Sequence, residues 1–303
     1  MKTSVVFIIF KRPDTTAKVF EAIRKAKPPK LFVIADGPRQ NYPEEEEKCK
    51  LTRTIIEYVD WECQVYKNYS NINLGCAKRV SSGLDWVFSQ VEEAIILEDD
   101  CVPHTTFFPF CETLLERYKD DTRIASISGQ NVQFGRKRTD YSYYFSRYNH
   151  VWGWATWRRS WQNFDITMKL WPKIQSEGFL NDILLDSLAI DCWTTRLQSV
   201  YDNPFGITWD YQWTFACWVQ NSLGIISNNN LISNIGFGAD STHFSKGKKS
   251  RYDSLPVEAI EFPLKYPPFI IRDVQADNFT QKSLFKESRL YRLKTRLRKL
   301  TSL

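Results

Sequence analysis

Three consecutive carboxylates, Glu98, Asp99 and Asp100, follow directly on the apolar run 94–97. A short apolar run with two isoleucines indicates a buried parallel strand, so we expect the acids at its carboxyl end, facing a crevice. Adjacent carboxylates repel one another, and a divalent cation or hydrogen-bond donors on a ligand would relieve that repulsion. A solvated acidic turn is the alternative, but the preceding apolar run favours a site for a metal ion and a nucleotide.

The chemistry of such a site follows from the charge that develops on a departing nucleoside diphosphate. Mg²⁺ or Mn²⁺ held by a carboxylate can stabilise that charge as a Lewis acid, and Asp100, the last acid of the three, is the best placed ligand. The sequence has neither a Gly-x-Gly-x-x-Gly turn after its first strand nor a phosphate-binding P-loop. A nucleotide would therefore be held by scattered contacts and a cation.

The elements that must position these acids alternate between strand and helix patterns. Strands are predicted at 3–10, 31–35, 63–66, 94–97 and 124–128, with helices at 13–24, 44–59, 76–89 and 106–118 between them. This alternation predicts an α/β fold with a mixed, mostly parallel sheet flanked by helices. Ligands of such sheets bind beyond the carboxyl ends of the strands, so Asp36, the turn 73–75 and the acids 98–100 should meet in one crevice.

The region after residue 128 is polar and aromatic, with helices predicted at 182–200 and 209–218 and a strand at 224–227. A glycine permits close approach of a ligand, and a tryptophan face stacks on the apolar side of a sugar. We therefore assign Trp152, Gly153 and Trp154 to a pocket for the donor sugar or the acceptor. An aromatic core is the alternative.

The strand-helix-strand start, Asp36-Gly37, Asn73-Leu74-Gly75 and the segment 97–100 resemble nucleotide-sugar glycosyltransferases of GT-A fold. The segment 98–108 is similar to the inverting N-acetylglucosaminyltransferase I family and its bacterial relatives, and the resemblance covers roughly residues 3–245. The chain departs from the generic Asp-x-Asp motif by having Glu98 at its first position.

The resemblance implies roles for individual residues. Asp36 would contact the base, Glu98 and Asp99 the ribose and sugar, and Asp100 the metal. Lys78 and Arg79 resemble basic residues near the nucleotide, with solvated helix charges as the alternative.

An inverting transferase needs a general base to deprotonate the acceptor hydroxyl. The segment 209–213 resembles the one that supplies this base in the family, which assigns the role to Asp210; flanking tryptophans would exclude water and raise its basicity. A carboxylate that caps the helix is the alternative, and Asp202 is the reserve candidate. His243, at the end of the glycine-rich run 236–243, resembles a late histidine that completes the metal shell; a surface or core histidine is the alternative.

The composition limits the class of protein. Seven cysteines without a Cys-x-x-Cys pair predict reduced packing residues, and the lack of a long apolar run or signal peptide predicts a cytoplasmic protein. More than the whole net charge of +6 comes from a leucine-containing basic tail, 282–299, whose amphipathic spacing suits the inner face of an anionic membrane. A frayed terminus is the alternative. The acidic crevice argues against a nucleic-acid partner, which needs a continuous basic groove.

The sequence thus predicts a metal-dependent, inverting hexosyl- or N-acetylhexosaminyltransferase. It would move a sugar from a nucleotide-diphosphate donor, expected to be a UDP-sugar, to a glycan or lipid-linked acceptor in surface polysaccharide synthesis. Residues 1–128 form the expected nucleotide-sugar half, 129–245 the acceptor-binding and catalytic half of the same domain, and 246–303 a C-terminal wrap with the basic tail. The alternative is a non-catalytic glycan-binding protein that uses the tryptophan-rich half.

Overall fold

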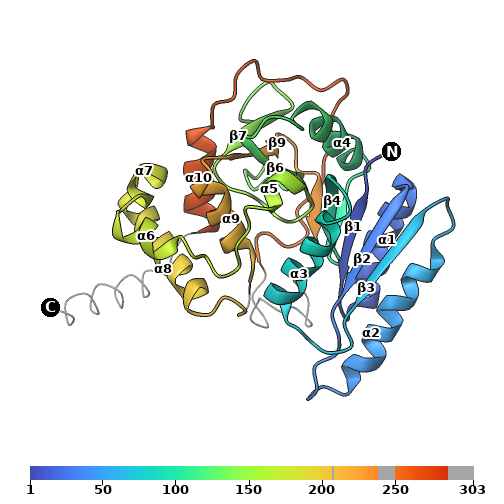
Figure 1. The fold of residues 1–303 in the computed structure, drawn as a ribbon. Coiled ribbons are helices and arrows are strands. Elements are labelled where there is room, and N and C mark those ends of the chain that lie inside the picture. Colours follow the sequence, from blue (N-terminus) through green and yellow to red (C-terminus); the bar gives the residue numbers. More distant parts are fainter. Residues whose placement is uncertain (207, 238–249, 286–303) are drawn as a thin grey trace.

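The computed structural model describes residues 1–206, 208–237 and 250–285, which fold around one large mixed sheet (Figure 1). The helices and strands are, in order, β1 (Val5–Ile9), α1 (Pro13–Ala26), β2 (Lys30–Ala35), α2 (Glu44–Thr54), a 3₁₀ turn (Ile55–Tyr58), β3 (Gln64–Tyr69), α3 (Cys76–Phe88), β4 (Glu93–Glu98), β5 (Cys101–Pro103), α4 (Phe107–Arg117), β6 (Ile124–Ser128), β7 (Tyr143–Ser146), β8 (Trp154–Trp157), α5 (Arg158–Trp161), α6 (Trp171–Ser176), α7 (Leu180–Leu184), α8 (Ser187–Asp202), α9 (Asp210–Val219), β9 (Leu223–Ser227), β10 (Ile232–Asn234) and α10 (Val274–Leu284).

The sheet has the strand order β3-β2-β1-β4-β8-β6-β9-β7. Its first four strands run parallel, β8 is antiparallel to both β4 and β6, β9 is parallel to β6, and β7 is antiparallel to β9. The predicted α/β fold with a mixed, mostly parallel sheet and flanking helices is confirmed. The strands β7 and β8 lie in the aromatic region and were not among the predicted elements.

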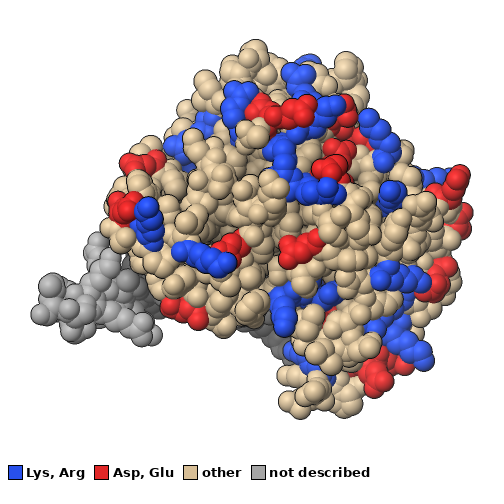
Figure 2. Space-filling view, in the orientation of Figure 1, with Lys and Arg blue, Asp and Glu red and all other residues tan. Residues whose placement is uncertain are grey.

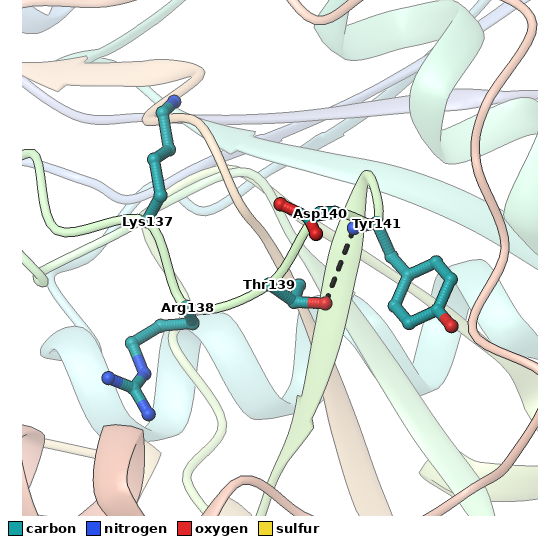
Figure 3. A pocket seen from close by; sticks show the side chains of 5 residues that line it. All are labelled: Lys137, Arg138, Thr139, Asp140 and Tyr141. Carbon is teal, nitrogen blue, oxygen red and sulfur yellow. Dashed lines mark hydrogen bonds between the residues drawn. The ribbon is translucent and has the colours of Figure 1, made fainter.

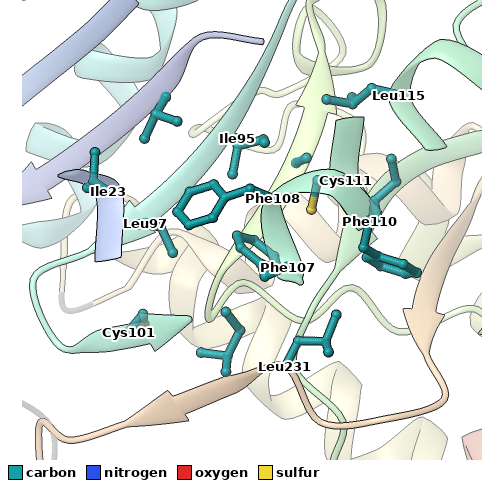
Figure 4. Packing of buried hydrophobic residues seen from close by; sticks show 14 of the residues in the cluster. Ile23, Ile95, Leu97, Cys101, Phe107, Phe108, Phe110, Cys111, Leu115 and Leu231 are labelled. Carbon is teal, nitrogen blue, oxygen red and sulfur yellow. The ribbon is translucent and has the colours of Figure 1, made fainter. Parts of the chain in front are cut away.

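Alternate residues of β1 serve opposite faces of the sheet, as the two-residue period of a strand requires. Val5, Phe7 and Ile9 pack in one cluster with apolar side chains of α1 and α4. Figure 4 shows how Phe107 and Phe108 of α4 lie against Ile95 and Leu97 of β4. The sheet is therefore buried on both faces, which explains the continuous apolar runs of its parallel strands.

The opposite face of the sheet is covered by α3 and α9. Val6 and Ile8 of β1 join Ile96 of β4, apolar residues of α3 and a tryptophan group from β8, α5 and the start of α9. Much of the aromatic content of the second half is thus core, which is the alternative considered for the tryptophans.

A second, two-stranded sheet pairs β5 antiparallel with β10. Ser233 lies opposite Val102 and Asn234 opposite Cys101. This pairing brings a segment from late in the chain beside the acids that follow β4, although neither strand was predicted.

Two of the sequence predictions lie outside the described residues: His243 and the part of the basic tail from residue 286 onward. Within the described ranges, each helix is too short or too polar to cross a lipid bilayer.

Candidate functional site

Asp36 follows β2 directly and organises the loop that starts α3. Its carboxylate accepts hydrogen bonds from the backbone N–H groups of Leu74 at 2.9 Å and Gly75 at 3.0 Å, and from Asn73 Nδ2 at 3.1 Å. Burial raises the pKa of Asp36, while these backbone donors oppose that shift. The expected meeting of Asp36 with the turn 73–75 is confirmed, and the carboxylate oxygens hold this loop in place. The base contact stays a prediction.

The acid cluster begins at Glu98, the last residue of β4, and continues into the turn before β5. Asp99 is only 3% exposed and accepts a hydrogen bond from the backbone N–H of Phe10 at 3.2 Å. Arg12 donates to Asp99, and its Nη2 also lies 2.9 Å from Asp100 Oδ2. A side-chain cation from the loop after β1 therefore neutralises part of the cluster.

Arg12 is the site residue that the sequence reasoning missed. The sequence offered only two buried-strand patterns, now β1 and β4, and the structure shows that these strands are neighbours with Ile8 opposite Glu98. Residues 10–12 and 98–100 therefore leave the sheet at the same edge. Burial lowers the pKa of Arg12, but the charges of Asp99 and Asp100 outweigh it and raise the pKa overall.

Burial also acts on the carboxyl groups of the cluster. It raises the pKa of Glu98 to about 8, and the negative charges of Asp100 and Asp99 add to that shift. Burial likewise raises the pKa of Asp99, against the effect of Arg12. The cluster therefore holds several acidic groups at close quarters with one internal cation.

Asp100 directly precedes β5 and contacts residues at the end of β10 and in the loop after it. Its Oδ1 accepts a hydrogen bond from Cys101 Sγ at 3.3 Å and from Asn234 Nδ2 at 3.5 Å. A Cβ at Gly236 would lie 2.0 Å from Asp100 Oδ2, so only glycine permits this close approach. The loop after β10 therefore packs directly against the acid cluster.

The donors around Asp100 permit a test of the expected metal. Within 1–206, 208–237 and 250–285, no group of three or more His, Cys, Asp or Glu side chains is arranged to hold an ion. Mg²⁺ commonly binds through one or two carboxylates together with substrate phosphates and water. The metal role of Asp100 stays a prediction, and such an ion would take its other ligands from substrate phosphates and water.

Asp210 is the first residue of α9 and accepts a hydrogen bond from Thr208 Oγ1. The residue that caps the helix is Trp209, so Asp210 is not the capping residue that the alternative required. The negative charge of Asp210 helps raise the pKa of Glu98 and of Cys76, at the start of α3. The fold therefore brings Asp210 into the electrostatic surroundings of the acid cluster, and its role as a base stays a prediction.

The three residues assigned to a sugar pocket have different surroundings. Trp152 is partly exposed and packs edge-on against Phe237, with ring centroids 5.8 Å apart. Trp154 is 0% exposed, and its ring packs at 5.6 Å from those of Trp209 and Trp213. The stacking role of Trp154 is therefore wrong for this structure, because its ring fills the core beneath β8.

The assignment of Gly153 to a ligand pocket is also corrected by the structure. Its φ is +63°, and an added Cβ would lie 2.2 Å from Ile232 Cδ1. The close approach that this glycine permits is thus made by β10 rather than by a ligand. It is a packing requirement of the β5–β10 sheet.

The two basic residues of α3, Lys78 and Arg79, differ in their exposure to solvent. Lys78 is exposed, which agrees with a solvated helix charge. Arg79 is buried and donates to Asn68 Oδ1 at 2.8 Å and to the Asn68 carbonyl, so it ties α3 to the end of β3. The reserve candidate Asp202 is exposed at the end of α8 and accepts a hydrogen bond from Gln198.

A separate pocket lies in the segment between β6 and β7, lined by residues 137–141 (Figure 3). Its two cations are paired, Lys137 with Glu258 at 3.1 Å and Arg138 with Asp273 at 3.1 Å. None of the predicted site residues lines it. On the face shown in Figure 2, basic and acidic side chains are interspersed, without a continuous basic groove.

The comparisons with known proteins give a distant likeness. No protein-family model and no curated protein matches the chain. UTP-bound UGPase from Acinetobacter baumannii matches 75% of this chain and 86% of its own at 8% identity, with a TM-score of 0.38. The 4-diphosphocytidyl-2C-methyl-D-erythritol synthase of Anaerococcus prevotii matches 52% and 72% at 9% identity, with a TM-score of 0.32.

A UDP-glucose pyrophosphorylase complexed with UDP-glucose matches 50% of this chain at 13% identity, with a TM-score of 0.29. The matched part spans 64% of that protein's chain. Likenesses of this size assign no role to any residue of this chain.

Proposed function

We propose that this protein is an inverting glycosyltransferase that takes its sugar from a nucleotide-diphosphate donor, with a UDP-sugar as the expected donor. One observation carries the proposal. Trp209 and Trp213, on either side of Asp210, pack in one cluster with Ile96 of β4, the strand that ends at Glu98, and the negative charge of Asp210 acts on Glu98. The proposed nucleotide-binding edge and a candidate base from another element are thus built on one hydrophobic cluster.

In this proposal the first half holds the donor. The loop fixed by Asp36 and the acids after β4 lie at the carboxyl edge of the parallel strands, where ligands of such sheets bind. Asp100 would hold Mn²⁺ or Mg²⁺, which would supply Lewis-acid stabilisation of the leaving diphosphate. Arg12 adds a fixed positive charge beside the same carboxylates.

The second half supplies the base. Asp210 would take the proton of an acceptor hydroxyl, whose oxygen forms the new bond to the anomeric carbon. The bond from that carbon to the diphosphate breaks, and the nucleoside diphosphate leaves with the electron pair. Trp152 is partly exposed, so its ring, unlike that of Trp154, remains available for stacking on a sugar. We propose a glycan or lipid-linked acceptor.

The burial of tryptophan weighs against a non-catalytic glycan-binding protein. Eight of the 11 tryptophans are buried, including those at 154, 157, 161, 171, 193, 209, 213 and 218. A lectin surface needs exposed aromatic faces, whereas these rings fill the core around β8, α8 and α9.

Turnover of a panel of UDP-sugars with Mn²⁺, read as released nucleoside diphosphate, tests the proposal. We expect Asp210→Asn to lower transfer by about 10²–10⁴-fold, as for loss of a general base. UDP binding measured by calorimetry should stay within about two-fold of wild type, because substrate binding does not need the base. Asp202→Asn is the matched control and should keep wild-type turnover.

Other outcomes separate the parts of the proposal. Undiminished turnover in EDTA, or in Asp100→Ala, would contradict the role of the metal. Release of pyrophosphate from UTP and a sugar 1-phosphate would assign nucleotidyl transfer instead. Sugar binding without nucleotide or metal would favour the glycan-binding alternative.

A further inference from the structure

Three aromatic side chains and two arginines form a surface cluster beside α10. The ring of Phe134, in the loop after β6, lies 5.6 Å from that of Tyr252 and 6.3 Å from that of Phe279 in α10. The guanidinium of Arg251 lies 4.4 Å from the centre of the Phe134 ring, and that of Arg136 lies 4.0 Å from the centre of the Phe279 ring. Phe134 is 38% exposed, and both arginines are exposed. We call these five residues the Phe134 cluster.

The two arginines of the Phe134 cluster lack an acidic partner in the described part of the chain. Their contacts are with aromatic rings, and neither Arg136 nor Arg251 forms an ion pair with a described carboxylate. By contrast, the next two residues along the chain, Lys137 and Arg138, are each paired with an acid. A guanidinium held over a ring by cation–π attraction can still donate its N–H groups to a carboxylate or phosphate. The cluster therefore suits a ligand with negative charge.

The two loops that carry these aromatic rings are tied to α10. Gln133 Nε2 donates to the carbonyl of Ala276 at 3.2 Å, and the Tyr252 hydroxyl donates to the carbonyl of Ser283 at 2.7 Å. Phe134 itself has a φ of +53°, which is unfavourable for a bulky side chain. Backbone strain of this kind persists only where the surrounding structure enforces it, and it occurs often at ligand sites. The Phe134 ring is thus held at the surface in a fixed position.

The Phe134 cluster lies at the same edge of the sheet as the acid cluster. β6 runs parallel to β4 because β8 is antiparallel to both, so the loop after β6 leaves the sheet where the acids after β4 do. The segment with Tyr252 reaches this edge through Ser254, whose backbone N–H donates to the carbonyl of Asn234 at 2.9 Å. Asn234 also contacts Asp100, and Tyr252 is only two residues, about 7 Å of chain at most, from Ser254. The cluster therefore adjoins the candidate site.

We propose that the Phe134 cluster binds a negatively charged sugar unit of the acceptor glycan, which rests on the glycosyl transfer proposed above. The rings of Phe134 and Tyr252 would stack on the apolar face of that sugar. Arg136 and Arg251 would donate charge-assisted hydrogen bonds to its carboxylate or phosphate group. The reacting hydroxyl would belong to another sugar unit of the same glycan, placed at the candidate site. The acceptor class is therefore an acidic glycan.

Calorimetry of the full chain with two acidic sugars tests the proposal. Trigalacturonate carries carboxylates and glucose 6-phosphate carries a phosphate, so the two probes distinguish the sources of negative charge. We expect at least one of them to bind, and its uncharged counterpart, methyl-esterified trigalacturonate or glucose, to bind at least about ten-fold more weakly. Added salt should weaken the binding. The measurement contains neither nucleotide nor metal, so its result does not depend on whether the chain transfers sugars.

Substitutions in the cluster locate the binding. Arg136→Gln/Arg251→Gln should raise the Kd of the acidic sugar at least about ten-fold, because hydrogen bonds to its charged group are lost. Phe134→Ser should also raise the Kd, whereas Phe134→Tyr keeps an aromatic face and should bind as wild type does. Arg117→Gln is the matched control and should leave the Kd unchanged. It removes another exposed arginine that lies over a ring, 4.1 Å from the centre of Tyr266.

Three results would overturn the proposal. The first is that neither acidic sugar binds at millimolar concentration. The second is equal affinity for the acidic sugars and their uncharged counterparts. The third is a loss of affinity in Arg117→Gln as large as in Arg136→Gln/Arg251→Gln, which would show a general effect of charge. Binding at the cluster in a protein that transfers sugar from no UDP-sugar would support the sugar site and contradict only the proposed reaction.

Discussion

Arg12 supplies part of the positive charge that was expected from a divalent cation beside the acid cluster. Its guanidinium bridges Asp99 and Asp100, so two of the three adjacent carboxylates have a partner within the protein. Fixed charge of this kind lets the cluster stay compact without a ligand, because the repulsion between the acids is partly offset. In our proposal the metal would therefore bind only at Asp100 and at the diphosphate of the donor.

Removal of Arg12 should expose the cost of burying Asp99. We expect Arg12→Met to lower the free energy of unfolding by about 3 kcal/mol, because a buried carboxylate is left without its partner. Urea denaturation measures the change, and adding Asp99→Asn should recover much of it. Arg24→Met breaks a comparable pair with exposed Asp60 and should change stability little. Equal losses in the two arginine variants would contradict this reasoning.

His150 should make stability depend on pH. Burial lowers its pKa from 6.5 to about 4, so the folded protein keeps the ring neutral while the unfolded chain takes up a proton. The contribution is complete above pH 6.5 and is lost as the pH falls towards 4, by about 3 kcal/mol in total. Denaturation midpoints between pH 7 and about 4 measure the slope. His150→Gln should flatten it; parallel slopes in wild type and His150→Gln would show that the ring contributes nothing.

Among the elements, the β5–β10 sheet connects packing to the site. It places Asn234 and Gly236 against Asp100, and its own position depends on the contact between Ile232 and Gly153. A glycine from the tryptophan-rich segment thus controls how closely β10 approaches the acid cluster. Gly153, which the sequence assigned to a sugar pocket, instead lets β10 pack closely beside the site.

A pair of glycine variants separates backbone strain from packing. Gly153 and Gly135 both have positive φ, but an added Cβ at Gly135 meets nothing within 4 Å. Gly135→Ala should therefore cost only about 1 kcal/mol, the penalty of a left-handed backbone. Gly153→Ala should cost about 3 kcal/mol, because the Cβ also collides with Ile232. Thermal unfolding measures both. Ile232→Val removes Cδ1 but keeps Cγ1, 2.6 Å from the added Cβ, so it should restore only part of the loss. Equal costs of Gly135→Ala and Gly153→Ala would contradict a role for the collision.

At the scale of the whole molecule, one sheet is shared by both halves of the chain. β8 from the aromatic region lies between β4 and β6, so the tryptophan core and the proposed nucleotide-binding edge are built on the same strands. The two ends of the candidate site, Asp210 and the acid cluster, are consequently built on elements that pack on one sheet. A ligand that binds between them should stabilise the entire fold.

Nucleotide and metal should therefore stabilise the protein together. UDP with Mn²⁺ should raise the melting temperature, since ligand at 100 times its Kd adds about 2.7 kcal/mol. Mn²⁺ alone should have little effect, because the described residues offer Asp100 without further carboxylates arranged around an ion. Differential scanning fluorimetry measures the shift, and Asp100→Asn should abolish the joint effect. Full stabilisation by Mn²⁺ without UDP would require ligands beyond the described residues.

Local patterns determined much of the first half. The positions of β1, β2, β4, α1 and α3 follow from apolar runs, a proline near a helix start and a glycine turn, and these signals act within a few residues. The meeting of Asp36 with the turn 73–75 could also be predicted, because parallel strands present their carboxyl ends at one edge.

The tertiary structure decided the rest, because those contacts depend on which strands become neighbours. Arg12 pairs with residues 87 and 88 positions away only once β1 lies beside β4. Trp154 is buried in the core because β8 enters the sheet antiparallel to β4. Gly153 has no room for a side chain because Ile232 of β10 lies against it. Glycine and tryptophan serve ligands and cores equally well, so their types alone cannot distinguish a pocket from packing; the neighbours that the fold supplies do.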